Sequence, residues 1–231
     1  MIEMFASAAA AADAAAHGIA DALTTALNTR GRATLVATGG RAPGPVYDRL
    51  KDVQLDWARV VVTLSDERCV SAEDPASNAR LVRERLLAGA ASKAAFVPLW
   101  RQAPSPEAAA EALEPALRAL VPFDAVVLGM GEDGHVASLI PGSPILAQGM
   151  DPAGGRLALA VPPGHGSPPL ARITLTLPAL LQARAIFLLV AGDAKREVIA
   201  QARAGADLPV RALLAQDRVP VRILWAPKHQ D

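Results

Sequence analysis

Cysteine is almost absent from this chain of 231 residues, which contains only Cys69. A single cysteine excludes an internal disulfide and a metal site built from several cysteines, and it suits a reducing compartment. Aromatic residues are also scarce, at 3% of the sequence. So few aromatic rings leave few platforms on which nucleic-acid bases could stack.

Neither sign of charge is in excess, because 23 Lys and Arg residues balance 23 Asp and Glu residues. No basic stripe is present that would neutralise a nucleic-acid backbone, so we expect no nucleic-acid partner. No apolar run reaches the roughly 18 residues of a membrane span. The amino-terminal segment has Glu3 as its first charge and an Ala-rich run broken by Asp13 and His17, unlike a secretory signal. We therefore expect a cytoplasmic protein without membrane contact, whose ligand is small.

Short aliphatic and β-branched runs alternate with helical patterns along the chain. Five such runs lie at residues 33–38, 59–64, 124–129, 185–190 and 221–225. Continuous apolar runs separated by helices are typical of a parallel sheet that is covered on both faces. The sequence therefore predicts an α/β fold, doubly wound, with a mostly parallel sheet, helices on both faces and a single domain over residues 1–231.

Several helices have recognisable starts. An Ala-rich segment predicts an opening helix from about Met4 to Leu27. Ser77, Ser105 and Asp193 each stand before a further helical pattern, as N-cap residues do. The segment 162–169 is rich in Pro and Gly and is predicted to be a loop, either a surface connection or a rim over the site.

Ligands of open parallel sheets bind beyond the carboxyl ends of the strands, so the residues after each strand are the candidates for chemistry. Gly39, Gly40 and Arg41 follow the first predicted strand. Two adjacent glycines let backbone N–H groups approach a phosphate closely. A tight turn that needs glycine for its backbone angles explains the same residues equally well.

Asp66 and Arg68 follow the second predicted strand. The planar guanidinium of Arg68 suits a phosphate, and a neighbouring carboxylate such as Asp66 could hold it in place. The alternative is a solvated loop with a local ion pair. Cys69 has no base nearby in the sequence that would activate it, and we interpret it as an ordinary small buried residue.

The most informative segment is G-M-G-E-D-G-H at residues 129–135, directly after the third predicted strand. Its glycines formally match the dinucleotide fingerprint G-x-G-x-x-G, yet Glu132 and Asp133 would repel a pyrophosphate. The glycines are better explained if they expose Asp133 and His135 side by side. Histidine is well suited to act as a general base near neutral pH, and a carboxylate can orient it. A structural loop histidine is the alternative.

Lys195 lies in the first turn of a predicted helix after the fourth strand, in a chain with only four lysines. A lysine at this place opposes the helix dipole, which predicts a counter-anion such as a substrate phosphate. A surface ion pair within the helix is the alternative. Arg172 lies at the start of a short predicted strand that precedes the fourth strand. We assign its side chain to the same candidate site at the carboxyl ends of the strands.

In order along the chain, the motifs TGGRAP, SDERCV, SNARLVRERLL, LGMGEDGHVASLIPG, ARITLTLPAL and GDAKREVI resemble those of the 6-phosphogluconolactonase family, the lactonases of the pentose phosphate pathway. The resemblance covers roughly residues 33–200. It implies a fold shared with glucosamine-6-phosphate deaminases and ribose-5-phosphate isomerases, no cofactor and no metal, and a histidine base that falls on His135. Two positions depart from the family pattern, because Arg41 replaces a Ser or Thr and Leu181 replaces an Asn.

The expected reaction is hydrolysis of 6-phospho-D-glucono-1,5-lactone to 6-phospho-D-gluconate by a monomer or homodimer. The phosphate would be held by Arg68, Lys195 and the backbone of the double glycine, with His135 activating water. An amino-sugar-phosphate deaminase or isomerase is one alternative, but such enzymes carry a further acidic residue shortly after the histidine, whereas here none precedes Asp151. A sugar-phosphate-binding module without activity is another, although it would not need an exposed Asp–His pair.

Overall fold

The computed structural model describes residues 1–228 of the chain. Its strands are β1 Ile2–Met4, β2 Ala33–Ala37, β3 Val60–Leu64, β4 Asp66–Arg68, β5 Ala95–Phe96, β6 Ala125–Gly129, β7 Ala158–Val161, β8 Arg172–Leu175, β9 Ile186–Ala191 and β10 Val221–Ala226. Its α-helices are α1 Ala8–Arg30, α2 Gly44–Leu50, α3 Asn78–Arg85, α4 Pro106–Leu120, α5 Leu146–Met150, α6 Leu177–Leu180, α7 Asp193–Arg203 and α8 Pro209–Ala215. Short 3₁₀ helices span Trp57–Arg59 and Gly89–Lys93.

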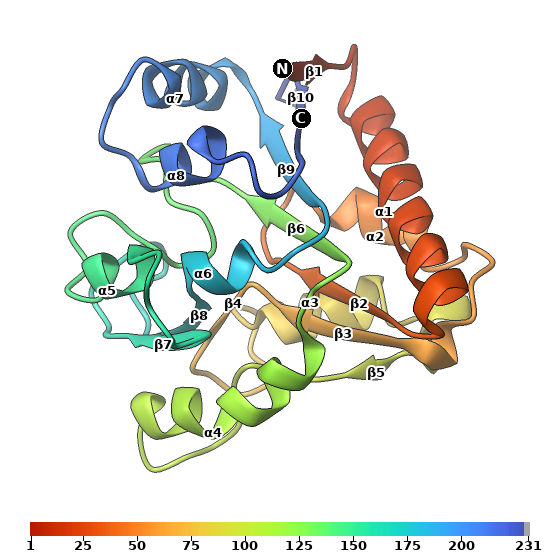
Figure 1. Ribbon diagram of the computed structural model, residues 1–231, viewed down its shortest axis with the longest axis horizontal. Coiled ribbons are helices and arrows are strands. Elements are labelled where there is room, and N and C mark those ends of the chain that lie inside the picture. The colour runs from red at the N-terminus through yellow and green to blue at the C-terminus, as the bar shows by residue number, and fades with distance from the viewer. Residues whose placement is uncertain (229–231) are drawn as a thin grey trace.

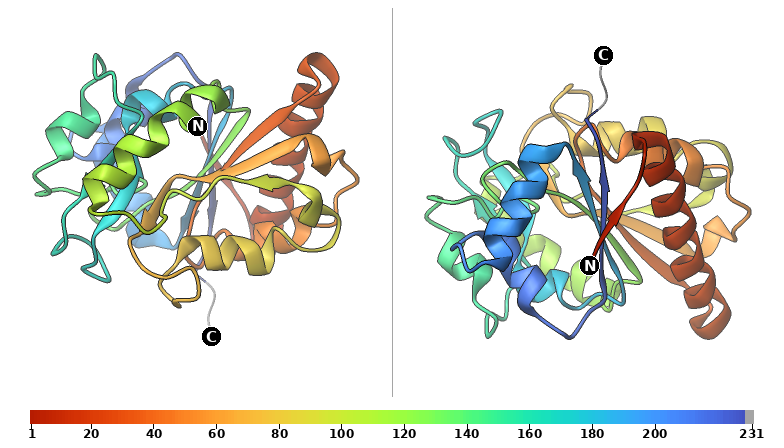
Figure 2. Two further views of the ribbon diagram at one scale, coloured as in Figure 1. Left: turned by 90° about the horizontal axis from the view of Figure 1, so that it is seen from below. Right: turned by 90° about the horizontal axis from the view of Figure 1, so that it is seen from above.

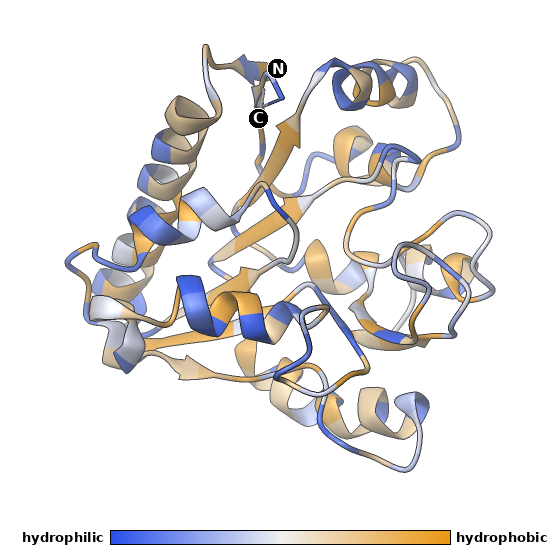
Figure 3. Cartoon of the chain, turned by 180° about the vertical axis from the view of Figure 1, so that it is seen from behind, coloured by the Kyte–Doolittle hydropathy of each residue, from blue (hydrophilic) through white to orange (hydrophobic). Residues whose placement is uncertain are grey.

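Seven strands form one parallel sheet in the order β1-β10-β9-β6-β2-β3-β5 (Figure 1). All five runs predicted as strands lie in it, as β2, β3, β6, β9 and β10. All residues of β2 are buried, and its neighbours are nearly so, which gives the centre of the molecule its apolar colour (Figure 3). Strands buried on both faces read as continuous apolar runs. The predicted doubly wound α/β fold is confirmed.

Helices cover both faces of this sheet (Figure 2). α1 packs over β2, β6, β9 and β10 on one face, and α7 packs on β9 on the other. Ile19, Leu23 and Leu27 are spaced four residues apart on α1, and all three are buried. Burying such a side chain contributes about 1.5 to 3 kcal/mol, so this stripe fixes α1 to the sheet.

The opening helix begins later than the sequence predicts. Met4 belongs to β1, and α1 begins at Ala8. The Ser7 hydroxyl accepts a hydrogen bond from the backbone N–H of Ala10 at 3.1 Å, which is an N-cap. The residues before this cap pair with β10, with Ile2 opposite Ile223. Because the cap stops the helix and β10 offers its edge, the first residues form an edge strand instead.

A second sheet of three antiparallel strands, in the order β4-β8-β7, lies beside the main sheet. Asp66 and Glu67 in β4 are buried, with exposed fractions of 5% and 2%, so this segment is not a solvated loop. The strand expected at Arg172 is β8, and all of its residues are buried because it is the middle strand and α4 packs against it. The register places Arg68 opposite Arg172.

The chain reverses its direction of travel at the centre of the main sheet. β2 and β6 are neighbours, but the chain proceeds from β2 outward to β3 and β5, and from β6 outward to β9 and β10. Open α/β sheets bind ligands at such a switch point, beyond the carboxyl ends of the strands. The turn after β2 and the loop after β6 both start there.

Candidate active site

The loop after β6 contains no helix until α5 begins at Leu146. A dinucleotide fingerprint needs a helix directly after its glycines, so that interpretation finds no support here. Gly134 has a φ of +77°, which glycine adopts readily. Its carbonyl accepts a hydrogen bond from the backbone N–H of Val210 at 2.9 Å, and a Cβ at Gly134 would lie 2.9 Å from Cβ of Leu208. The segment that leads into α8 therefore packs closely on this loop.

His135 and Asp133 lie side by side, as the sequence predicts. Nδ1 of His135 lies 2.6 Å from Oδ1 of Asp133, and the same oxygen accepts the backbone N–H of His135 at 3.2 Å. An ionised carboxylate only accepts hydrogen bonds, so the proton between them is on Nδ1, and in the neutral imidazole the lone pair is then on Nε2. The His135 side chain is 26% exposed, and its Nε2 makes no hydrogen bond to residues 1–228. This nitrogen can therefore take a proton from water.

Gly131 makes the close approach of this pair possible. A Cβ at Gly131 would lie 2.3 Å from both Oδ1 of Asp133 and Nδ1 of His135. The backbone N–H of Gly131 donates to the carbonyl of His135 at 2.9 Å, which closes the loop on itself. The glycine is thus required for space.

Lys195 lies in the first turn of α7, beside the same loop. Burial lowers the pKa of its ammonium; the carboxylates of Glu132 and Asp133 oppose this effect, and the cations of Arg41 and Lys228 add to it. Lys195 is therefore within electrostatic reach of both the loop after β6 and the turn after β2. Lys195 and the groups that act on it thus comprise three cations and two carboxylates, a balance that suits an anionic ligand.

The double glycine forms the turn between β2 and α2. Gly40 has a φ of +96°, and Gly39 lies against Asn78, whose Oδ1 would be 1.8 Å from a Cβ at Gly39. The tight turn thus accounts for both glycines. Their backbone N–H groups make no hydrogen bond within residues 1–228, which leaves these donors for an anion.

Arg68 is held beside this turn by an amide. Nη1 of Arg68 donates to the carbonyl of Ala76 at 2.6 Å and to Oδ1 of Asn78 at 3.0 Å. The sequence suggested a neighbouring carboxylate for this role, and that expectation is corrected. Both carboxylate oxygens of Asp66 accept hydrogen bonds from serine hydroxyls instead.

Arg172 is buried, with 3% of its surface exposed. Nη1 donates to the Ser138 hydroxyl at 3.2 Å, and Nη2 donates to the carbonyl of Pro168, in the loop 162–169, at 2.8 Å. Burial lowers the pKa of Arg172; Asp66 opposes this effect and Arg68 adds to it. Within the described residues, Nε of Arg172 and Nε of Arg68 are buried without a hydrogen-bond partner. Each of these two guanidiniums thus keeps one buried N–H group that no described residue accepts.

The predicted site residues fall into two groups, one on each side of the turn after β2. The group toward β6 and β9 consists of Asp133, His135, Lys195 and Arg41. The group toward β3 consists of Asp66, Arg68 and Arg172. The double glycine lies between them, because β2 is the strand between β6 and β3.

Among the buried polar residues around the site that are absent from the sequence-based prediction are Asn78, Ser138 and Thr174. Each makes side-chain hydrogen bonds to a residue of the site or its loop. The available signal is weak, because Asn78 begins a strongly polar helix, and Ser138 and Thr174 are single small polar residues among apolar neighbours. Only the tertiary contacts reveal what they hold.

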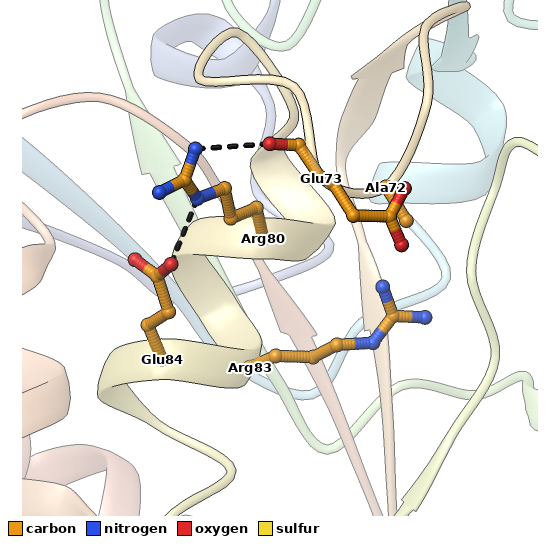
Figure 4. A pocket seen from close by; sticks show the side chains of 5 residues that line it. All are labelled: Ala72, Glu73, Arg80, Arg83 and Glu84. Carbon is orange, nitrogen blue, oxygen red and sulfur yellow. Dashed lines mark hydrogen bonds and ion pairs between the residues drawn. The ribbon is translucent and has the colours of Figure 1, made fainter.

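Other features of the surface carry less chemistry. A pocket lined by Ala72, Glu73, Arg80, Arg83 and Glu84 contains none of the predicted site residues (Figure 4). In it, Arg80 donates to the carbonyl of Glu73 and to the carboxylate of Glu84, so its charges are largely matched.

Burial raises the pKa of the half-buried Cys69 thiol to about 12, with Glu67 and Glu107 adding to the effect, so the thiol stays protonated near neutral pH. Among residues 1–228, no three His, Cys, Asp or Glu side chains gather into a group that could hold a metal ion. Over the same range, none of the helices combines the length and apolar character of a membrane span.

Comparison with known families gives a consistent result. The model of the family described as glucosamine-6-phosphate isomerases/6-phosphogluconolactonase matches residues 6–225. The chain belongs to this family. Within the family, a 6-phosphogluconolactonase of Caulobacter vibrioides is 49% identical over 214 residues, which cover 93% of this chain and 92% of that protein. The predicted resemblance to the 6-phosphogluconolactonases is confirmed, and the chain is an enzyme of this family.

Solved structures of the family share the fold. The crystal structure of a 6-phosphogluconolactonase from Shewanella baltica has a TM-score of 0.90 and 39% identity, covering 98% of this chain and 97% of that one. A monomeric glucosamine-6-phosphate deaminase has a TM-score of 0.80 but 20% identity, with 97% and 96% coverage. At that identity the deaminase shows a common fold alone, so the side chains of the site must distinguish the activities.

Proposed function

We propose that this family member hydrolyses 6-phospho-D-glucono-1,5-lactone to 6-phospho-D-gluconate in the oxidative pentose phosphate pathway, acting in the cytoplasm as a single lactonase domain. The observation that carries the proposal is the His135–Asp133 pair at the switch point, with Nε2 of His135 unoccupied. The lactonase names of relatives at up to 49% identity support the choice of substrate.

His135 acts as a general base in the proposed mechanism. Its Nε2 takes a proton from water, and the resulting hydroxide attacks the lactone carbonyl. As the bond between the carbonyl carbon and the ring oxygen breaks, the imidazolium returns the proton to that oxygen. Asp133 accepts a hydrogen bond from Nδ1–H throughout, which stabilises the imidazolium while it exists. These steps use no cofactor or metal.

The phosphate is bound by Arg68, Lys195 and the backbone N–H groups of Gly39 and Gly40. Neighbouring strands lie about 4.8 Å apart, so the three spacings between β9 and β3 amount to about 14 Å. The long side chains of Lys195 and Arg68 therefore approach the central turn from opposite sides. Their charges hold the substrate so that its carbonyl lies beside His135.

The proposal is tested by turnover of freshly made phosphogluconolactone, with glucosamine 6-phosphate as the alternative substrate. We expect rapid hydrolysis of the lactone and no release of ammonia from the amino sugar. A titration with a nicotinamide dinucleotide should show no binding. Ammonia release without lactone hydrolysis would identify a deaminase, and sugar-phosphate binding without either activity would identify a binding module.

His135→Ala should lower kcat for the phosphorylated lactone about 10²-fold or more, the usual contribution of a general base, while KM changes little. The matched control is His17→Ala, because His17 is an exposed helical residue paired with Asp21 at 3.4 Å. Initial rates corrected for spontaneous hydrolysis measure both variants. Turnover of His135→Ala close to that of the control would contradict the role of His135.

A further inference from the structure

A continuous chain of buried hydrogen bonds runs beneath the proposed active site. Ser65 Oγ lies 2.9 Å from Thr38 Oγ1 and 3.0 Å from Asp66 Oδ1. The second oxygen of Asp66 accepts the Ser138 hydroxyl at 2.7 Å, and that hydroxyl accepts Nη1 of Arg172 at 3.2 Å. All five residues are buried, with exposed fractions of 5% or less. The chain connects the segments after β2, β3 and β6 with the start of β8.

Ser138 is the member of this chain that belongs to the loop carrying His135. Its hydroxyl donates to Asp66 and accepts from Arg172, and its backbone N–H donates to Thr174 Oγ1 at 3.0 Å. Ser138 is completely buried, so it cannot itself touch a substrate. Its three hydrogen bonds instead attach the loop to β4 and β8.

Between His135 and Ser138 the backbone turns sharply. Ala137 has a φ of +51°, the only positive φ of a non-glycine residue within the described chain. Residues other than glycine rarely adopt this left-handed conformation, and they keep it only when the surrounding structure enforces it. The turn sends His135 toward the carboxyl edge of the sheet and Ser138 into the interior. The anchoring of Ser138 is what can enforce it.

We propose that Ser138 is a positioning residue of this enzyme: through Asp66, Arg172 and Thr174 it fixes the loop in the conformation that directs Nε2 of His135 at the lactone. The inference rests on the proposed function for the identity of the reaction. The same inference gives Asp66 a role other than phosphate contact, because its carboxylate oxygens accept hydrogen bonds from Ser65 and Ser138.

The test compares Ser138→Ala with Ser143→Ala. Ser143 is a matched control because it is buried in the same loop and its hydroxyl has no partner within residues 1–228. We expect Ser138→Ala to lower kcat about 10-fold or more, as small displacements of a catalytic group do, with KM nearly unchanged. Ser143→Ala should match the wild type. A kcat for Ser138→Ala equal to that of Ser143→Ala would overturn the proposal.

A second variant and a spectroscopic readout keep the test decisive. Thr174→Val leaves Ser138 in place but removes the acceptor of its N–H, so it should also lower kcat, and it carries the test if Ser138→Ala fails to fold. The protein has four histidines, so the imidazole NMR signals of His135 can be identified from their loss in His135→Gln. These signals should shift in Ser138→Ala and Thr174→Val but not in Ser143→Ala. If the wild type hydrolyses no lactone, the proposed function fails. The NMR signals then test the positioning role alone: a shift in Ser138→Ala supports it, and unchanged signals overturn it.

Discussion

In the proposed mechanism His135 acts through Nε2, because Asp133 occupies Nδ1 at 2.6 Å. Asp133→Asn should lower kcat about 10²-fold or more, since the amide can donate to Nδ1 and so place the proton on Nε2, the wrong tautomer for a base. Glu132→Gln removes the same charge from the neighbouring position without that hydrogen bond and should retain most of the turnover. Steady-state kinetics of both variants check this. Equal losses in the two would mean that charge matters and the tautomer does not.

If the half-buried Lys195 binds the phosphate as proposed, substrate affinity should have an alkaline pH limit. Burial lowers the pKa of its ammonium, so the charge is lost at lower pH than the charge of an exposed lysine. Affinity for 6-phosphogluconate should therefore fall on the alkaline side, where the phosphate itself no longer titrates. Calorimetric titrations with this stable product across the alkaline range measure the effect.

Lys195→Arg is the diagnostic variant for that limit, because a guanidinium stays protonated at higher pH. It should move the alkaline loss of affinity to higher pH, and the affinity at neutral pH should be below that of the wild type because the guanidinium has a different geometry. Lys93→Arg changes an exposed lysine at the end of a 3₁₀ helix and should leave the wild-type profile unchanged. Identical profiles for Lys195→Arg and the wild type would remove Lys195 from the binding site.

At the scale of elements, alanine substitutions at two glycines, one at the end of β6 and one in the loop after it, should have opposite effects on activity. Gly131→Ala places a methyl group 2.3 Å from Oδ1 of Asp133 and Nδ1 of His135, so the pair must separate and kcat should fall at least 10-fold. Gly129→Ala meets nothing within 4 Å and should be nearly silent. Kinetics together with the melting temperature check this, and a loss of kcat in Gly131→Ala without large destabilisation is expected. Equal activity of the two variants would contradict the arrangement of the loop.

The loop and the strands around it show which features the sequence can predict. Residues that follow apolar runs were recognisable as candidates, because parallel strands buried on both faces leave a clear pattern and share one edge. β1 and β4 were not recognisable, since each has three residues and depends on a distant partner, as Asp66 does on Thr174. The role of Ser138 could not be predicted for the same reason: its partners come from two other segments of the chain.

For the whole molecule, the strand order determines how the two proposed phosphate-binding cations are placed. Lys195 follows β9 and Arg68 follows β3, on opposite sides of β6 and β2. Binding by two cations from different parts of the chain should therefore depend on the whole sheet. The effect of these two cations also distinguishes a phosphosugar enzyme from a general lactonase, because only a phosphorylated substrate is bound more tightly by both charges.

Arg68→Ala and Lys195→Ala should each raise KM for the phosphorylated lactone about 10-fold or more, the contribution of a charge-assisted hydrogen bond, with some loss of kcat where the phosphate also positions the carbonyl. The unphosphorylated lactone should be a poor substrate for the wild type and nearly indifferent to either change. Inorganic phosphate should inhibit the wild type more strongly than the variants, since it occupies the same place. Lys93→Ala, which removes a lysine outside the proposed site, should resemble the wild type in all three measurements.

Equal efficiency on both lactones, with variants that hydrolyse the phosphorylated one normally, would refute the phosphate site. A fall in kcat on both lactones in Arg68→Ala alone would instead place Arg68 at the carbonyl end of the substrate, next to the guanidinium of Arg172, and leave the phosphate to Lys195 and the double glycine.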